Sequence, residues 1–195
     1  MSIPTPFNPM GTLGAGLTPG YKLVESVYFD GSTYVNTGII AKTAPLYRAD
    51  ITAVVNPDRL SLMGASGNSP YSFIGLRADS TIYAGASYGY GGNVLYNEKR
   101  CIWEFAEDGV YVDGEKIVNN AGVESLMEWK IMSCRYLGDY EMKGTFYGLT
   151  LRNKDNELVA QYLPVYNSVT NEYLLWETVS KTPVRATKGQ IKGVE

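Results

Sequence analysis

Five acidic residues fall close together in the middle of the chain, and paired carboxylates can catalyse glycoside hydrolysis without any histidine. The five are Glu104, Glu107, Asp108, Asp113 and Glu115. A strand with carboxylates at alternating positions would point them to one face, as an acid and its partner base or nucleophile require. Here the spacing is irregular, and an Asp-Gly turn dipeptide divides the cluster. We interpret it as the solvated end of a hairpin and expect no enzymatic activity.

The sequence lacks the residue combinations that most other catalytic sites and metal sites require. The chain has no histidine, which removes the usual general base and the commonest transition-metal ligand. Its two cysteines, Cys101 and Cys134, are too few for a zinc site or a disulfide framework. Both lie in alternating apolar runs, so we expect buried thiols. No phosphate-binding glycine motif or nucleophile elbow is present. The sequence therefore predicts no cofactor and no bound metal.

The composition sets broad limits on the type of protein. The chain has 195 residues, of which 45% are hydrophobic and 19% charged, enough to build the core of one domain. The formal net charge is −3, which provides no electrostatic basis for binding nucleic acid or an anionic membrane. No apolar run reaches the roughly 18 residues expected of a transmembrane helix.

The elements that would position these residues are short strands separated by turns. The turn dipeptide Asp113-Gly114 and the tetrapeptide at 153–156 predict hairpins, and Asp30-Gly31-Ser32 predicts another between strands at 23–29 and 33–39. Only a turn around 123–128 has helical character. Other expected strands are 47–55, 71–77, 81–86, 94–96, 99–106, 110–112, 116–118, 129–135, 145–152 and 158–163. Ten or more short strands at this spacing predict an all-β sandwich or barrel.

The three tryptophans differ in their predicted positions. Trp103 and Trp129 stand in the middle of alternating strands, so we expect both in the core. Trp176 lies near the end of the chain and fits either the core or the surface.

Residues 1–20 have a composition unlike the rest of the chain. Four prolines and four glycines disfavour both helix and strand. Apolar residues nevertheless recur at intervals, whereas a disordered linker would be rich in Ser, Glu or Lys. We predict an extended arm whose apolar residues either dock on a neighbouring subunit or pack on the arm's own domain. These predicted anchors are Ile3, Phe7, Met10, Leu13 and Leu17.

Several segments resemble known β-domains. Residues 103–115, with Tyr111 and Asp113-Gly114, are similar to the central hairpin of concanavalin A-like and laminin G-like domains, and residues 144–151 resemble a later strand. More specifically, residues 20–39 resemble an opening segment common in bacteriophage virion structural proteins, and residues 158–166 resemble their closing strand. The chain departs from that pattern at Asn36, where aspartate is usual, and at 172–177, where a Gly-Leu-Tyr-Asp stretch is usual.

The resemblance implies an all-β, two-sheet antiparallel jelly-roll sandwich over residues 21–187. The extended N-terminal arm, 1–20, would precede it and a C-terminal tail, 188–195, would follow. It also implies a virion structural protein: a head fibre, a capsid decoration protein or a tail-associated module. Such a protein would bind other virion proteins through the arm and form a homo-oligomer, of which trimers are common in fibres.

The expected location is the extracellular virion, after synthesis in the host cytoplasm. The first 14 residues lack the basic and apolar regions of a signal peptide, which fits release by particle assembly and lysis.

The most unusual loop candidate is residues 84–93, where glycine and tyrosine alternate. Tyrosine offers a flat apolar face with a polar tip, which suits sugar rings and hydrated interfaces. We predict that Tyr88, Tyr90 and Asn93 contact a glycan or a subunit; the alternative is a hairpin whose tyrosines cover the sandwich. A carbohydrate-binding module that recognises polysaccharide, such as a host glycan, is therefore the alternative function. A glycosidase is a third and would need a pair of carboxylates.

Overall fold

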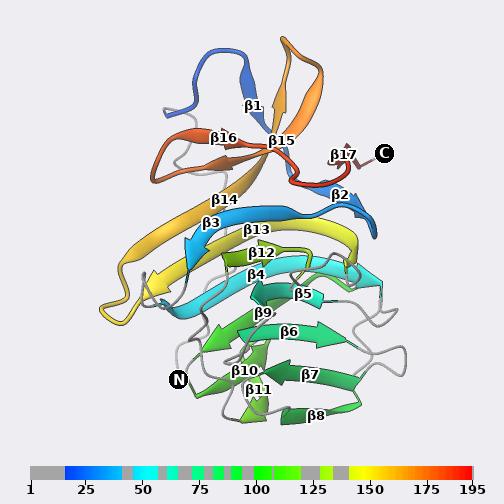
Figure 1. Ribbon diagram of the computed structural model, residues 1–195, viewed down its shortest axis with the longest axis vertical. Coiled ribbons are helices and arrows are strands. Elements are labelled where there is room, and N and C mark those ends of the chain that lie inside the picture. The colour runs from blue at the N-terminus through cyan, green and yellow to red at the C-terminus, as the bar shows by residue number, and fades with distance from the viewer. Residues whose placement is uncertain are drawn as a thin grey trace.

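The computed structural model describes residues 16–40, 46–56, 61–65, 72–76, 81–85, 89–93, 99–106, 108–119, 128–133 and 141–194. The regular secondary structure in these ranges consists entirely of β-strands, which confirms the all-β prediction (Figure 1). The strands are β1 (Tyr21–Leu23), β2 (Val27–Asp30), β3 (Val35–Ile40), β4 (Leu46–Asn56), β5 (Ser61–Ala65), β6 (Ser72–Leu76), β7 (Thr81–Gly85), β8 (Gly89–Asn93), β9 (Cys101–Ala106), β10 (Gly109–Val112), β11 (Glu115–Asn119), β12 (Glu128–Ile131), β13 (Lys143–Asn153), β14 (Leu158–Asn167), β15 (Glu172–Glu177), β16 (Thr182–Val184) and β17 (Lys192–Gly193).

The described strands form two antiparallel sheets. The main sheet has the order β11-β10-β9-β4-β13-β14-β15-β16, and β1, β2 and β17 join it off this path. The second sheet has the order β3-β12-β5-β6-β7-β8. Strands β5 to β8 follow one another as simple hairpins, whereas β3 and β12 come from distant parts of the chain.

Alternate residues of both sheets meet in one buried cluster, which makes the arrangement sandwich-like. Trp103 and Phe105 of β9 and Trp129 of β12 are fully buried, and this confirms the predicted core positions of both tryptophans. The rings of Phe105 and Trp129 pack edge to face across the two sheets, with centroids 5.8 Å apart.

Cys101 is a buried free thiol, as predicted. Burial, reinforced by the nearby Asp113 carboxylate, raises the pKa of the Cys101 thiol to about 11, so the thiol stays protonated at neutral pH. Cys134 lies outside the described residues.

The predicted hairpin around Asp30-Gly31-Ser32 is wrong. Strand β2 pairs with β13 and β17 in the main sheet, while β3 pairs with β12 in the second sheet. The turn itself exists: the Asp30 carboxylate accepts hydrogen bonds from the Ser32 backbone N–H at 3.0 Å and from the Ser32 and Thr33 hydroxyls at 2.8 and 3.0 Å. It redirects the chain from one sheet to the other, because β2 and β3 face the same core from opposite sides.

Two other predicted turns are confirmed. Asp113 and Gly114 both have positive φ, +50° and +85°, and connect β10 to β11 as a two-residue hairpin turn. The turn at 153–156 connects β13 to β14, and the Asn153 side-chain oxygen accepts the backbone N–H groups of Asp155 and Glu157.

Halfway along its length, β14 separates from β13 and enters a second group of strands. Residues 158–162 pair with β13, and residues 165–167 pair with β1 instead. Pro164, which has no N–H, lies at the change of partner, and its carbonyl accepts the Val24 N–H at 3.1 Å. We call β1, β15, β16 and this end of β14 the lobe; Figure 1 shows it at one end of the molecule.

The lobe has an apolar cluster of its own. Val165, Leu174 and Trp176 are buried there, and the Trp176 ring lies 5.2 Å from that of Tyr21 on β1. The position of Trp176, which the sequence left open, is therefore internal.

Glu177 holds the turn that closes β15 onto β16. Its carboxylate accepts backbone N–H groups from Val179 at 2.9 Å, Ser180 at 2.6 Å and Gln161 at 3.2 Å. Burial acts to raise the pKa of Glu177, but the hydrogen bonds from Ser180, Val179 and Gln161 outweigh it and lower the pKa below its ordinary value.

The last part of the chain, predicted as a tail, contains β17. Residues Lys192 and Gly193 pair with β2, and Ile191 is buried in the main core. The C-terminal residues are thus an integral part of the sandwich.

Removing the Ile191 side chain tests whether this segment contributes to stability. We expect Ile191→Ala, at a position only 2% exposed, to lower the free energy of unfolding by about 2–5 kcal/mol. Val194→Ala is the matched control, because Val194 is 51% exposed and its truncation should cost no more than about 0.5 kcal/mol. Urea denaturation followed by tryptophan fluorescence measures both. Equal losses for the two variants would contradict this role.

The Glu177 turn predicts a pH dependence. Because the folded-state pKa lies below the ordinary 4.5, the ionised carboxylate stabilises the fold above that pH, and this contribution is lost as the pH falls below 4.5. We expect Glu177→Gln to be less stable than the wild type at pH 7 and to approach it near pH 3. Glu115→Gln, which removes an exposed carboxylate, is the control in urea denaturation at both pH values. A constant difference between wild type and Glu177→Gln would refute the assignment.

Candidate functional site

The glycine–tyrosine segment forms a hairpin at the edge of the second sheet. In the register of β7 with β8, Tyr90 lies opposite Tyr83 and Asn93 opposite Thr81. Strand β8 is the last strand of that sheet in the described part of the chain, and β11 of the main sheet lies against it. Tyr88, in the connection, lies outside the described residues. The backbone thus forms the hairpin of the alternative hypothesis and places Tyr90 and Asn93 together on an edge strand.

Leu17, the last predicted anchor of the arm, packs against the lobe of its own chain. It joins Tyr21 and Leu23 in covering the buried Val165 and Trp176. We call Leu17, Tyr21 and Leu23 the arm root. Ile3, Phe7, Met10 and Leu13 lie outside the described residues. For Leu17, the contact is the one expected of an anchor that packs on its own domain.

Backbone contacts fix the direction of the chain at the arm root. The Gly20 carbonyl accepts the Ser168 N–H at 2.8 Å and the Ser168 hydroxyl at 3.0 Å. Gly20 has φ +97°, and a Cβ there would lie 3.2 Å from the Val169 side chain, so a glycine fits best. The chain therefore enters β1 along a defined path beside the β14–β15 turn.

Two described members of the acidic cluster, Asp108 and Asp113, make their contacts at opposite ends of β10. Asp108 accepts hydrogen bonds from Lys116 at 2.8 Å and from the Tyr111 hydroxyl at 2.7 Å, and these two bonds lower the pKa of Asp108. At the other end of β10, Asp113 contacts Lys99 at 3.3 Å and accepts the Ile102 N–H at 2.9 Å. Glu107 lies outside the described residues. The interpretation of these residues as a hairpin end is supported.

One member of the acidic cluster, Glu104, has an acidic residue as its register partner on another strand. Glu104 of β9 lies opposite Asp50 of β4 in the register, and Tyr111 of β10 lies opposite Glu104. Register partners share a face of the sheet. The sequence predicts both strands, but their spacing along the chain carries no information about which residues become opposite.

Three described tyrosines already have a cation over the ring. Arg100 lies 3.9 Å from the ring centroid of Tyr147, Lys130 lies 4.7 Å from that of Tyr34, and Lys116 lies 5.5 Å from that of Tyr111. A ring face covered by a cation is less available for stacking on a sugar. These three rings are therefore poorer candidates for stacking on a sugar.

Within the described ranges, no group of three or more His, Cys, Asp or Glu residues is placed to hold a metal ion. The same ranges contain no helix long and apolar enough to cross a membrane.

Comparison with known proteins identifies no relative of this chain. The chain matches no protein-family model, no curated protein and no solved structure.

Proposed function

We propose that this chain is a bacteriophage virion structural protein, a head fibre, capsid decoration or tail-associated module, that acts by assembly. The observation that carries the proposal is the arm root. Leu17 and Tyr21 pack on the buried cluster of the lobe. The chain that precedes them therefore joins the sandwich at a defined point. From that point, the anchors Ile3, Phe7, Met10 and Leu13 dock on a neighbouring subunit or another virion protein.

The proposed fold is a concanavalin A/laminin G-like jelly roll. Two features of the segments that carry the resemblance support it. The hairpin at 103–115 contributes Trp103, Val110 and Val112 to the core, and the segment at 144–151 lies in β13, between β4 and the β2 and β14 strands. The first segment thus ends at the β11 edge of the main sheet, whereas the second lies inside that sheet, and both contribute to the buried core.

In a closed homo-oligomer, each arm can dock on the next copy, so that every docking site is filled. A particle component of this kind needs no catalytic group. The assignment of Asp108 and Asp113 to turn and strand contacts agrees with a non-enzymatic role.

A carbohydrate-binding module is the alternative that a specific observation favours. Tyr90 and Asn93 lie together on β8, the last strand of the second sheet in the described part of the chain. The two functions are compatible, because a virion module can also bind a glycan of the host surface.

Charged substitutions in the arm test assembly. We expect full-length protein to have a mass that is a multiple of 21.5 kDa by light scattering. Phe7→Asp with Met10→Asp should reduce that mass to one chain, because a charge cannot be buried at a docking site without a large cost. Asn8→Asp puts one charge in the same arm at a polar position and should leave the mass unchanged. Identical masses for all three proteins, together with unchanged incorporation into virions, would exclude the arm as the assembly element.

Alanine substitutions in the hairpin test glycan binding. We expect Tyr88→Ala with Tyr90→Ala to weaken binding to host-surface polysaccharide about ten-fold, the equivalent of about 1.4 kcal/mol of lost aromatic contact. Tyr147→Ala is the control, since Arg100 covers that ring. Glycan-array binding measures the three proteins. If hairpin and control variants bind as the wild type does, the hairpin is not the contact surface.

A further inference from the structure

Residues 187–193, which we call the strap, bridge the two sheets. On the second-sheet side, Tyr34 donates its N–H to the Lys188 carbonyl at 3.3 Å, and Thr187 donates its N–H to the Tyr34 carbonyl at 2.9 Å. On the main-sheet side, Lys192 and Gly193 pair with β2. Strands β2 and β3 do not pair with each other. The strap thus connects β2 of the main sheet with the start of β3 in the second sheet, two strands that the turn at Asp30 separates.

The strap and its binding site have complementary charges. Lys188 Nζ lies 3.1 Å from the Glu141 carboxylate, and Lys192 Nζ lies 2.9 Å from the Asp30 carboxylate. Glu141 is buried, so leaving its carboxylate without the Lys188 partner would be energetically costly. Both cations are on the strap and both anions are on the body of the sandwich.

Neutral hydrogen bonds fix the register of the strap between these ion pairs. Asn36 donates its N–H to the Thr187 hydroxyl at 2.8 Å, and Gln190 donates its N–H to the Thr33 hydroxyl at 3.2 Å. Because these bonds involve particular side chains, a shifted strap would lose them.

The glycines and the isoleucine of the strap also match their surroundings. A Cβ on Gly189, which has φ +74°, would lie 2.2 Å from the Thr33 hydroxyl oxygen, and a Cβ on Gly193 would lie 2.5 Å from the Tyr173 ring. Ile191 between them enters the core. Every residue of the sequence Thr-Lys-Gly-Gln-Ile-Lys-Gly is therefore recognised individually, as a bound peptide is along a strand edge.

We propose that the site formed by β2, residues 33–36, Glu141 and Tyr173 is a peptide-binding site, and that it binds the strap of a second copy of this chain by exchange. In the exchanged form, each strap keeps every contact described above, on the partner's sandwich. Only the short connection at Arg185 and Ala186, between β16 and the strap, changes its path, and this change costs the ion pair of Arg185 with Glu172 and the packing of Ala186 on the main core. Exchange of an identical element is a low-cost route to a dimer.

Exchange leaves the arm root untouched, because Leu17 and Tyr21 contact the lobe and not the strap site. Failure of arm docking and failure of strap exchange are therefore separate results.

Single cysteines placed in different copies test the exchange. Lys188→Cys and Glu141→Cys replace the two partners of one ion pair, each in a separate full-length chain. The two variants are unfolded in urea, mixed, refolded together at high concentration and oxidised. We expect a covalent dimer of twice the 21.5 kDa chain mass, with a 188–141 disulfide identified by peptide mass mapping.

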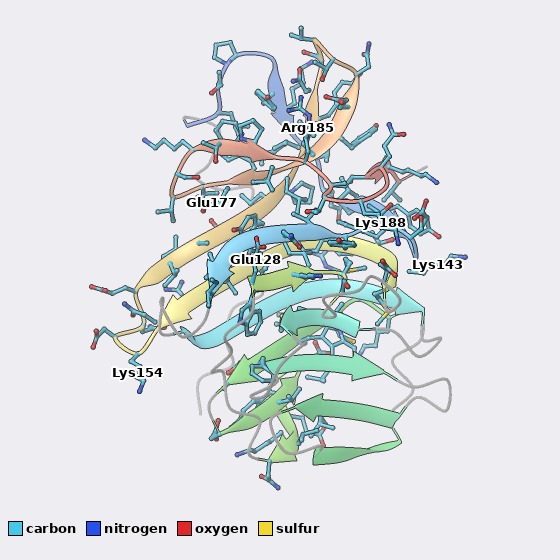
Figure 2. All side chains as sticks on the ribbon, in the orientation of Figure 1. Glu128, Lys143, Lys154, Glu177, Arg185 and Lys188 are labelled. Atoms are coloured by element: carbon cyan, nitrogen blue, oxygen red, sulfur yellow. The ribbon has the colours of Figure 1, made fainter. Side chains whose placement is uncertain are left out.

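The control mixture joins Lys188→Cys with Lys154→Cys, because Lys154 lies at the far end of the β13–β14 hairpin (Figure 2). We expect about ten-fold more dimer in the test mixture than in the control, since a bound strap raises the local thiol concentration. The pair Lys192→Cys and Asp30→Cys repeats the test if Glu141→Cys fails to fold. Equal dimer yields in test and control mixtures of folded proteins would overturn the proposal.

Discussion

The structure depends on the way in which one long strand, β13, shares its two edges. One edge pairs with β4 along the whole of β13, while the other is divided between β2, at residues 143–146, and β14, at residues 149–152. Because β14 occupies only part of that edge, its remaining residues are free to pair with β1 and build the lobe. Because β2 is short, its outer edge is covered by a correspondingly short element, β17. Both the arm root and the strap are therefore consequences of this division.

The local features of the fold were predictable from the sequence, because strands and turns depend on neighbouring residues. The buried Trp103 and Trp129 and the Asp113-Gly114 turn follow from alternation and turn chemistry. The pairing of strands did not follow, since it depends on which apolar faces meet across the core. That is why the sequence predicts a hairpin at Asp30 that the structure does not form, and why it does not indicate that Asp50 and Glu104 are register partners. The lobe is unpredictable for the same reason, because it forms where β1 pairs with the distant end of β14.

The two candidate contact regions lie at opposite ends of the molecule. The lobe with the arm root is at one end and β8 is at the other, with the body of the sandwich between them (Figure 1). A module attached to a particle by its arm would thus present the glycine–tyrosine hairpin away from the attachment point. Tyr147 of β13 and Tyr34, just before β3, are engaged by cations of the same chain. This separation would let the proposed assembly and glycan contacts form at the same time.

The pairing of early with late strands has a consequence for synthesis of the chain. Tyr21 of β1 pairs with Asn167, and Tyr28 of β2 pairs with Lys192, so the first strands wait for partners that are synthesised more than 140 residues later. Contacts between residues so distant in sequence slow folding, because a long loop must close before they form. Until then, β1 and β2 are exposed edges in a crowded cell, where chaperones and neighbouring nascent chains compete for them. A chain of this topology completes its fold only once the residues up to Gly193 have left the ribosome.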